Sequence, residues 1–475
     1  MKKLIAISIV LVIVSAVAFA EEKALKIGFD ASIYSDLIYA TKNSGEDPDG
    51  KTDAYDNVKG TFNFLSSTNT AIPGSGVSLT FTHTGEHHEA SLQLGTDGLL
   101  DRLGKLSDTH WSDFLESGIG DWYIKGNAGP FDGYVGNTGY GGKVATFDVF
   151  NDFLARDKLK LNGFGVYVPS FKLDFTDPDA EPSVGASMQG SANMNAFGDD
   201  AFALGIRFMN DFRFAVGTSL SYDGWDNPDD SVSSVGGMFM FSGDNIADLL
   251  TFDLFYGVAG GDTQTNYRGQ GLWKNIFGAY FGLNIVENLG ISVGYTGTTL
   301  VQEPTDGSAT EDKPVTTTHP WYSGISLHFN YTGIDNMGIT FNNNISFAGV
   351  TGIEEEDKYN ASISGMPLAK DYKENGFAWH AALKVGYALN DALTVNLQVA
   401  NLLTTFSMEY GDDKMSFTKD NFRAVLTGDY TVGAVTVGAG LSMDLVSNSG
   451  TANDDSTGKS STFTFGIPVY FKLSF

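Results

Sequence analysis

The densest group of metal-ligating side chains lies near residue 85. His83, Glu86, His87, His88 and Glu89 occur within seven residues. Two histidines four residues apart bind a metal ion when they share one face of a helix. Here the residues connect two runs that alternate like strands, so the helical spacing loses its meaning. His83, His87 and His88 are therefore weak candidates for a metal site, and we predict a solvated turn with no metal and no cofactor.

Other residues that could carry chemistry lack a supporting motif. Acidic stretches at 46–49, 354–357 and 412–413 offer oxygen ligands for Ca²⁺, but none has the spacing of a known calcium loop. The seven histidines are compatible with a hydrolase, yet no surrounding motif singles one out. We predict that the acidic stretches are solvated loops and that the protein is not an enzyme.

The composition excludes several classes of protein. The 475 residues include 57 acids and 29 bases, a net charge of −28, which argues against a nucleic-acid partner. The absence of Cys excludes a disulfide scaffold, Cys-ligated zinc and thiol catalysis. The aromatic content of 13% argues against a disordered chain. The length suits one large all-β barrel as well as two or three ordinary domains.

The first twenty residues are typical of a secretory signal peptide. Two lysines precede an apolar stretch at 4–14, and Ala18-Phe19-Ala20 provides small residues where a signal peptidase reads them. We expect cleavage after Ala20, export of the chain, and a single domain at 21–475.

Apolar and polar residues alternate along most of the remaining chain. Every odd position from Phe463 to Phe475 is apolar, whereas the even positions are mostly polar or small. A period of two is typical of a strand with one apolar face. The same alternation occurs at 377–389, 393–399 and 435–445 and in earlier runs. The sequence therefore predicts an all-β protein.

The connections between these runs alternate in length. Short Asn/Asp/Gly pairs, which suit tight hairpins, occur at 210–211, 287–288, 335–336, 390–391 and 432–433. Longer polar connections are expected at 40–57, 177–200, 259–274, 300–319, 348–375, 405–416 and 447–460. Short turns at one end and long loops at the other are typical of an outer-membrane barrel.

The runs predict a transmembrane antiparallel β-barrel of about 18 strands, within a range of about 16 to 20. Thirteen runs follow position 201, and earlier, less regular runs lie at 25–37, 76–84, 88–95, 119–127, 131–138, 159–168 and 170–176. The segment 98–117 breaks the pattern and is expected to be helical, either as a plug in the lumen or on an extracellular loop.

Three properties place the apolar faces against outer-membrane lipid. The opposite faces are rich in Gly, Ser, Thr and Asn, with single charges, which suits a wet lumen. The runs last about 9–13 residues, close to the roughly 9–11 that a tilted strand needs to cross hydrocarbon. Aromatic residues such as Trp321, Tyr331 and Trp379 gather near the ends of runs, as interfacial girdles require.

The C-terminal residues resemble the last strand of bacterial outer-membrane β-barrels. The sequence Val469-Tyr470-Phe471-Lys472-Leu473-Ser474-Phe475 has a terminal Phe and apolar residues at every second position before it. The resemblance implies that the barrel-assembly machinery reads Tyr470, Leu473 and Phe475. Segments 121–131 and 134–137 are similar to early hairpins of porins, so the whole chain looks like a porin-type barrel, for which a homotrimer is possible. Pro468 departs from the pattern, because it removes a ladder donor and marks a candidate bulge.

A barrel of this size encloses a lumen wide enough for water and small solutes, so we predict a porin for passive diffusion of small hydrophilic solutes. By strand parity, the residues expected to line the pore are Lys26, Asp30, Lys172, Asp174, Arg207, Arg213, Asp253, Lys384, Arg423, Asp429, Asp444 and Lys472. In porins, which this chain resembles, an inward-folded loop supplies acids opposite a basic wall. The candidate for this loop is 139–156, with Asp148, Asp152 and Arg156. Because acids dominate the loops, we expect a mild cation preference.

Other functions stay open for such a chain. Long acidic loops also suit an adhesin or a structural surface protein, and some outer-membrane barrels are enzymes. A transporter of hydrophobic compounds would need an apolar pocket in the lumen, for which the aromatic residues of 98–115 are the one sign. Conductance separates a porin from a plugged barrel.

Overall fold

A computed structural model describes most of the strands and short turns of the chain. The described residues are 26–46, 59–63, 76–85, 88–97, 119–136, 145–146, 160–161, 166–172, 183–189, 201–209, 212–223, 232–263, 270–304, 319–351, 360–361, 367–368, 372–410, 413–452 and 455–474. The expected signal peptide, the expected helix at 98–117 and Phe475 lie outside them. In the part of the chain that is described, no helix is long and apolar enough to cross a bilayer.

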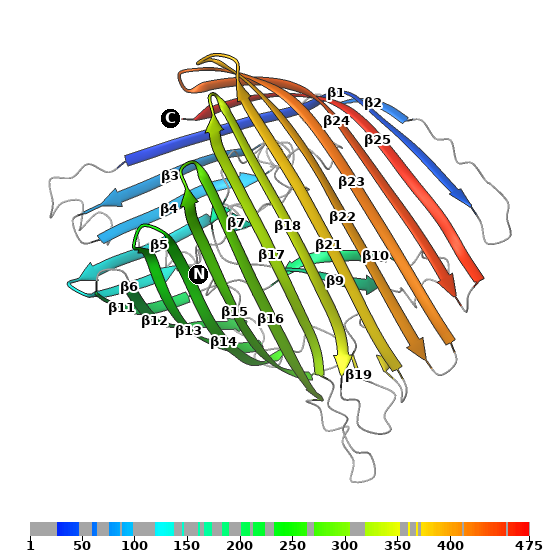
Figure 1. The fold of residues 1–475 in the computed structure, drawn as a ribbon, viewed down its shortest axis with the longest axis horizontal. Helices are drawn as coiled ribbons and strands as arrows, with labels where there is room; N and C mark the ends of the chain where they lie inside the picture. The colour runs from blue at the N-terminus through cyan, green and yellow to red at the C-terminus, as the bar shows by residue number, and fades with distance from the viewer. Residues whose placement is uncertain are drawn as a thin grey trace, which may run out of the picture.

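Eighteen strands form a closed antiparallel barrel (Figure 1), which confirms the predicted fold class. They are β1 (Lys26–Glu46), β3 (Gly76–Thr84), β4 (His88–Asp97), β5 (Ile119–Ala128), β6 (Phe131–Gly136), β11 (Ala201–Phe208), β12 (Phe212–Asp223), β13 (Val232–Ile246), β14 (Leu250–Thr263), β15 (Gln270–Val286), β16 (Leu289–Pro304), β17 (His319–Ile334), β18 (Met337–Thr351), β21 (Tyr372–Ala388), β22 (Leu393–Tyr410), β23 (Asp413–Val432), β24 (Val435–Ala452) and β25 (Asp455–Ser474). The short strand β2 (Lys59–Asn63) joins the same sheet by pairing with β1.

The barrel closes where the first strand meets the last. β1 pairs with β25 along one edge and with β3 along the first part of its other edge. The register of β1 against β25 shifts next to Asp36, the residue opposite Pro468. Proline has no N–H to donate, so an irregularity is expected at this point of the ladder. Because each of the eighteen strands pairs with a neighbour on both sides, the barrel wall that the structure describes presents no unpaired edge strand to lipid.

The short turns lie at the end of the barrel that holds both Lys26 and Ser474. Gly129, Asn288, Asn336 and Gly433 occupy these turns with φ of 62°, 63°, 62° and 58°. A positive φ at the turn matches the twist of the flanking strands, and Gly and Asn adopt it at low cost. The predicted turns at 287–288, 335–336, 390–391 and 432–433 each connect two paired strands and are confirmed, whereas 210–211 lies outside the described residues.

The last strands extend much farther than the sequence predicts. β22 to β25 contain 18, 20, 18 and 20 residues and run through most of 405–416 and 447–460. The expectation of long loops at these two places was wrong. The pairing between neighbouring strands simply continues past the apolar segment, and polar cross-strand contacts support it. Ser416 and Thr451 are one such pair, with their hydroxyl oxygens 2.6 Å apart.

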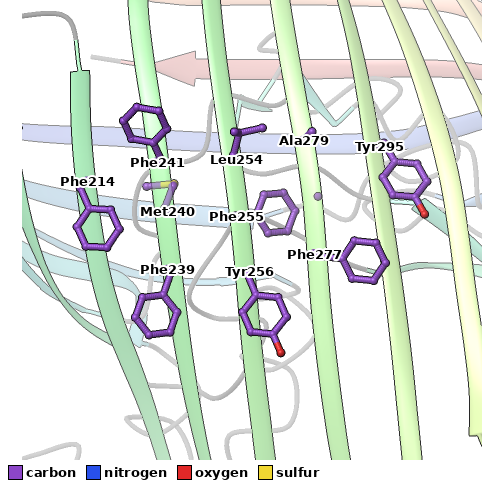
Figure 2. Close-up of a pocket in the computed structure, with 11 residues that line it drawn as sticks. Phe214, Phe239, Met240, Phe241, Leu254, Phe255, Tyr256, Phe277, Ala279 and Tyr295 are labelled. Atoms are coloured by element: carbon purple, nitrogen blue, oxygen red, sulfur yellow. The ribbon is translucent and has the colours of Figure 1, made fainter.

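The two faces of the sheet differ in both chemistry and exposure. On β21, Trp379 and Leu383 are each 37% exposed, whereas Ala378 and His380 on the other face are 1% and 0% exposed. In a closed barrel outward side chains splay apart and inward ones crowd together, so the exposed apolar face is the outer one. Figure 2 shows this face over β12–β16, where a shallow apolar pocket lies among aromatic side chains.

An aromatic row on the outer face marks the end of the barrel with the short turns. The rings of Phe208, Phe212, Phe241, Phe252 and Phe281 follow one another across β11 to β15, with neighbouring centroids 5.4–6.5 Å apart. Aromatic girdles of this kind occur where a barrel crosses a membrane–water interface. The outer surface is therefore that of a transmembrane β-barrel.

A separate hairpin lies against the wall rather than within it. β9 (Val166–Lys172) pairs with β10 (Ser183–Gln189) in a sheet of their own. The backbone of β9 lies against β17, β18, β21 and β22, and that of β10 against β22 and β23. Figure 1 shows the hairpin between these strands and the opposite wall, in the interior of the barrel. The expectation that 159–168 and 170–176 are barrel strands was wrong.

The remaining described strands are two-residue pairs. β7 (Ala145–Thr146) pairs with β8 (Lys160–Leu161), and β19 (Asn360–Ala361) pairs with β20 (Pro367–Leu368).

Candidate functional site

Ten of the twelve residues predicted to line the pore lie, by register, on the inner face of the barrel wall. They are Lys26, Asp30, Arg207, Arg213, Asp253, Lys384, Arg423, Asp429, Asp444 and Lys472. Lys172 ends β9, so placing it on the barrel wall was wrong. Asp174 lies outside the described residues. That any of these residues faces a permeating solute stays a prediction.

The inner face of β23, β24, β25 and β1, here called the ion-pair wall, holds a buried salt bridge. Arg423 and Asp444 are directly opposite each other on β23 and β24. The Arg423 Nη2 donates to Asp444 Oδ2 at 2.5 Å, and the side chains are 3% and 11% exposed. A charge is tolerated at such depth only when it is paired and hydrogen-bonded. The salt bridge therefore holds both side chains in fixed positions on the inner face.

A second carboxylate of the ion-pair wall is held by neutral donors. The hydroxyl of Tyr470 donates to Asp429, and Asn396 Nδ2 donates to the same carboxylate at 3.2 Å. Gly438 lies directly opposite Tyr470, and a Cβ at this glycine would overlap the tyrosine ring. The Lys472 Nζ lies 5.2 Å from the centre of that ring. The glycine thus allows the ring to lie flat over the neighbouring strand and reach Asp429.

A smaller charged group lies on the inner face of another part of the barrel, over β6, β11 and β12. Arg213 of β12 forms a two-point ion pair with Asp132 of β6 across β11. Gly205 of β11 lies between them, and a Cβ there would overlap the Asp132 carboxylate. Arg207 is exposed nearby, and Asp253 of β14 is buried. At the end of the barrel with the short turns, Glu89 binds Lys125 Nζ at 2.8 Å and accepts a hydrogen bond from Tyr123.

The inner face of β16, β17, β18 and β21, here called the amide–imidazole wall, is polar but almost uncharged. Its buried polar members are Ser292, Asn342, Asn344, Ser346 and His380, all at most 8% exposed. Asn344 Nδ2 lies 3.4 Å from His380 Nδ1. The Nδ1 atom of His328 is buried without a hydrogen-bond partner among the described residues. Parity alone puts these amides and imidazoles on the inner face, but charge was the property used to select pore residues, so they were missed.

The interior hairpin covers the amide–imidazole wall. The backbone of β9 lies against β17, β18 and β21, the strands that carry His328, Asn344 and His380. The predicted constriction loop was 139–156, but Asp148, Asp152 and Arg156 lie outside the described residues. What narrows the interior in the described structure is a hairpin that begins ten residues later. Its sequence alternates less regularly than the later barrel strands do and contains Pro169, which lacks the N–H that a central strand needs.

The predicted histidine cluster is partly assembled at the turn between β3 and β4. His88 Nε2 lies 3.3 Å from His83 Nδ1, whereas His87 lies outside the described residues. His83 is 1% exposed, so the expectation of a solvated turn was wrong for this residue. No group of three or more His, Cys, Asp or Glu side chains converges within the described structure.

No protein-family model and no curated protein matches the sequence. Among solved structures, the chain is similar to the outer-membrane channel DcaP of Acinetobacter baumannii, with 12% identity, a TM-score of 0.39, and 95% and 98% of the two chains covered. It is similar to OmpT of Vibrio cholerae at 9% identity and a TM-score of 0.42, over 95% and 98%. It is also similar to an anion-selective porin from Comamonas acidovorans, with 11% identity, a TM-score of 0.38, and 95% of this chain and 100% of the porin covered.

The closed barrel itself is established by the pairing of β1 with β25, not by these likenesses. A closed antiparallel barrel with an apolar outer face and a polar interior is the architecture of bacterial outer-membrane proteins.

Proposed function

We propose that the protein is an outer-membrane channel for passive diffusion of small hydrophilic solutes. The observation that carries this proposal is the inner face of the 18-stranded barrel, where charged and amide side chains occupy the positions between outward apolar residues. Barrels of about 16–18 strands enclose an aqueous channel when their interior is polar. An adhesin or structural barrel would have no need for such a lining.

The interior hairpin is proposed to set the width of this channel. β9 and β10 lie inside the barrel against five consecutive strands of one wall, so they occupy lumen cross-section that the wall alone would leave open. Pore diameter and the groups that line it decide which solutes pass. The wall opposite the hairpin contains the Arg213–Asp132 pair and the exposed Arg207.

The proposed selectivity is a mild preference for cations. Acids outnumber bases by 57 to 29 in the whole chain, whereas several inner acids are already engaged. Asp132 and Asp444 bind arginines, and Asp429 accepts two hydrogen bonds. The excess negative charge would therefore act at the mouth, where it concentrates cations before they enter.

Targeting and assembly are proposed to follow the pattern of the C-terminal resemblance. Residues 1–20 would direct export, and Tyr470, Leu473 and Phe475 would be read by the barrel-assembly machinery. In the strand, Tyr470 belongs to the buried inner face and Leu473 to the opposite one. A homotrimer is the proposed assembly, and its mass in detergent would show it directly.

Single-channel recording in planar bilayers tests the channel. The purified barrel should give discrete conductance steps. Under a KCl gradient, the sign of the reversal potential should show that K⁺ is more permeable than Cl⁻. A variant in which 166–189 is replaced by a short Gly/Ser linker should conduct about twice as well or better, because the lumen is wider. A folded wild-type barrel that passes no current would favour the adhesin or structural function instead. Uptake of apolar compounds without ion conductance would favour the hydrophobic-compound transporter, and a clear anion preference would overturn the selectivity.

A further inference from the structure

Two histidines that the channel function does not use face each other at the rim of the barrel. His83 lies near the end of β3 and His88 begins β4, five residues later. Their ring nitrogens Nδ1 and Nε2 are 3.3 Å apart, and the ring centroids are 5.2 Å apart with an angle of 10° between the planes. The amide–imidazole wall belongs to other strands, β16 to β21, which are separated from β3 and β4 by several strands of the barrel.

The backbone of the turn is built to bring the two rings together. The Gly85 N–H donates to the His88 carbonyl at 2.8 Å and closes the hairpin. A Cβ at Gly85 would overlap the His88 ring. Glycine at this position therefore allows the ring to fold back over the turn toward His83. By register His83 is opposite Ala90, on the same side of the sheet as Leu79 and Phe81.

The distances fit two imidazoles that share a metal ion. If both nitrogens point at one position, a spacing of 3.3 Å between the nitrogens and 5.2 Å between the centroids places that position about 2.0 Å from each nitrogen at a near-tetrahedral angle, as for Zn²⁺ bound by His. A straight N–H···N hydrogen bond of equal length would set the rings end to end and the centroids farther apart.

Burial holds the His83 ring in place with Nδ1 toward His88. The ring is 1% exposed, and its Nε2 is buried without a hydrogen-bond partner among the described residues. His88 is only partly buried, so one side of the pair is open at the rim of the barrel.

We propose that His83 and His88 form a two-imidazole site for a borderline divalent transition-metal ion such as Zn²⁺ or Cu²⁺. Imidazole nitrogen suits these ions better than Ca²⁺ or Mg²⁺, which prefer oxygen ligands. Water completes the coordination in the minimal form of the site. The ion would link the ends of β3 and β4 at the end of the barrel that holds Lys26 and Ser474.

Copper binding to the folded barrel in detergent at pH 7.5 tests the site. Electron paramagnetic resonance of the one-to-one complex should show splitting from two nitrogen ligands, and Zn²⁺ should displace the Cu²⁺. His88→Ala should weaken Cu²⁺ binding at least tenfold. His328→Ala, which removes a histidine from the amide–imidazole wall, should leave the affinity unchanged and serves as the matched control.

Gly85→Ala is the sharper variant, because it keeps both ligands and moves only the His88 ring. It should also weaken Cu²⁺ binding at least tenfold, while heat-modifiable migration on gels shows that the barrel is still folded. If His88→Ala prevents folding, this variant and His88→Gln decide the outcome. Wild-type binding no tighter than that of His88→Ala, or a copper spectrum without two nitrogens, would overturn the site. The channel proposal is unaffected, since no measurement here involves conductance.

Discussion

The ion-pair wall and the amide–imidazole wall are two stretches of one inner surface, built by the same alternation on neighbouring strands. One buries Arg423 against Asp444, and the other buries Asn344 against His380. Both bury polar groups, but only the first buries full charges. The amide–imidazole wall is the one that the backbone of β9 covers most directly. A surface closed off by a hairpin loses water, and neutral amides tolerate that loss better than single charges do.

In the proposed channel, the two walls would offer a solute different groups. In the ion-pair wall, Arg423, Asp444 and Asp429 already bind other side chains of the barrel. The wall would therefore present a fixed pattern of charges to a solute. The amide–imidazole wall offers neutral donors and acceptors next to the hairpin, and these suit hydroxyl and amide groups of uncharged solutes.

The largest expected effect comes from breaking the buried ion pair. Asp444→Ala leaves Arg423 as a buried charge without its carboxylate, which should lower the free energy of unfolding by about 3–5 kcal/mol. Urea unfolding of the barrel in lipid vesicles, followed by Trp fluorescence, measures it. Glu409→Ala is the control, because its pair with Lys414 is exposed and spans 3.1 Å; it should cost about 1 kcal/mol or less. Equal losses for the two variants would mean that burial does not distinguish the pairs.

The next effect concerns the carboxylate held by neutral donors. Tyr470→Phe removes the hydroxyl that donates to Asp429 but keeps the ring over Gly438 and the aromatic character of the C-terminal strand. A hydrogen bond to a charged group contributes about 1.5–3 kcal/mol, and the free energy of unfolding should fall by that amount. Tyr430→Phe, on the outer face and 55% exposed, should change it little. A larger loss for Tyr430→Phe would contradict the assignment of the two faces.

Much of the fold could be predicted from the sequence because one rule, the alternation of apolar and polar residues, acts at every strand. It placed Arg423 and Asp444 on the same face of successive strands, and the structure confirms both positions. It did not show that they are opposite each other, because register depends on turn geometry and on the whole ladder. Tyr470 and Asp429 are separated by a further strand, and no local pattern connects them.

The interior hairpin shows where the same rule fails. Val166–Lys172 was assigned to the barrel on a less regular alternation interrupted by Pro169, but in the structure it pairs with β10 alone. Alternation predicts which side chains share a face of a strand, but it does not predict which other strand that strand pairs with. The long β22–β25 hairpins were missed for a related reason, because polar residues at 405–416 and 447–460 resemble loops although their backbones continue the ladder.

Mutations in the amide–imidazole wall should lower the free energy of unfolding less than mutations in the ion-pair wall. Asn344→Ala removes a donor 3.4 Å from His380 Nδ1 in a buried site, and a neutral hydrogen bond contributes about 0.5–1.5 kcal/mol. Asn448→Ala is a matched control, since Asn448 donates to Ser460 over the same 3.4 Å in an exposed site. The buried variant should be the less stable of the two in the same urea assay. Identical unfolding curves would show that the amide–imidazole wall is hydrated after all.

The smallest expected effect is on ion selectivity, and it tests whether the paired charges of the inner wall matter to permeating ions. Charges at the mouth are screened as salt rises, because the Debye length falls from about 10 Å at 0.1 M to about 3 Å at 1 M. The cation preference, measured from reversal potentials, should therefore decline toward equal permeability over that range. The double variant Arg423→Met/Asp444→Leu removes one charge of each sign from the ion-pair wall and should leave the preference unchanged at every concentration. A preference that survives 1 M salt but changes in the double variant would move the selectivity from the mouth to the ion-pair wall, since a buried pair is screened far less than exposed acids are.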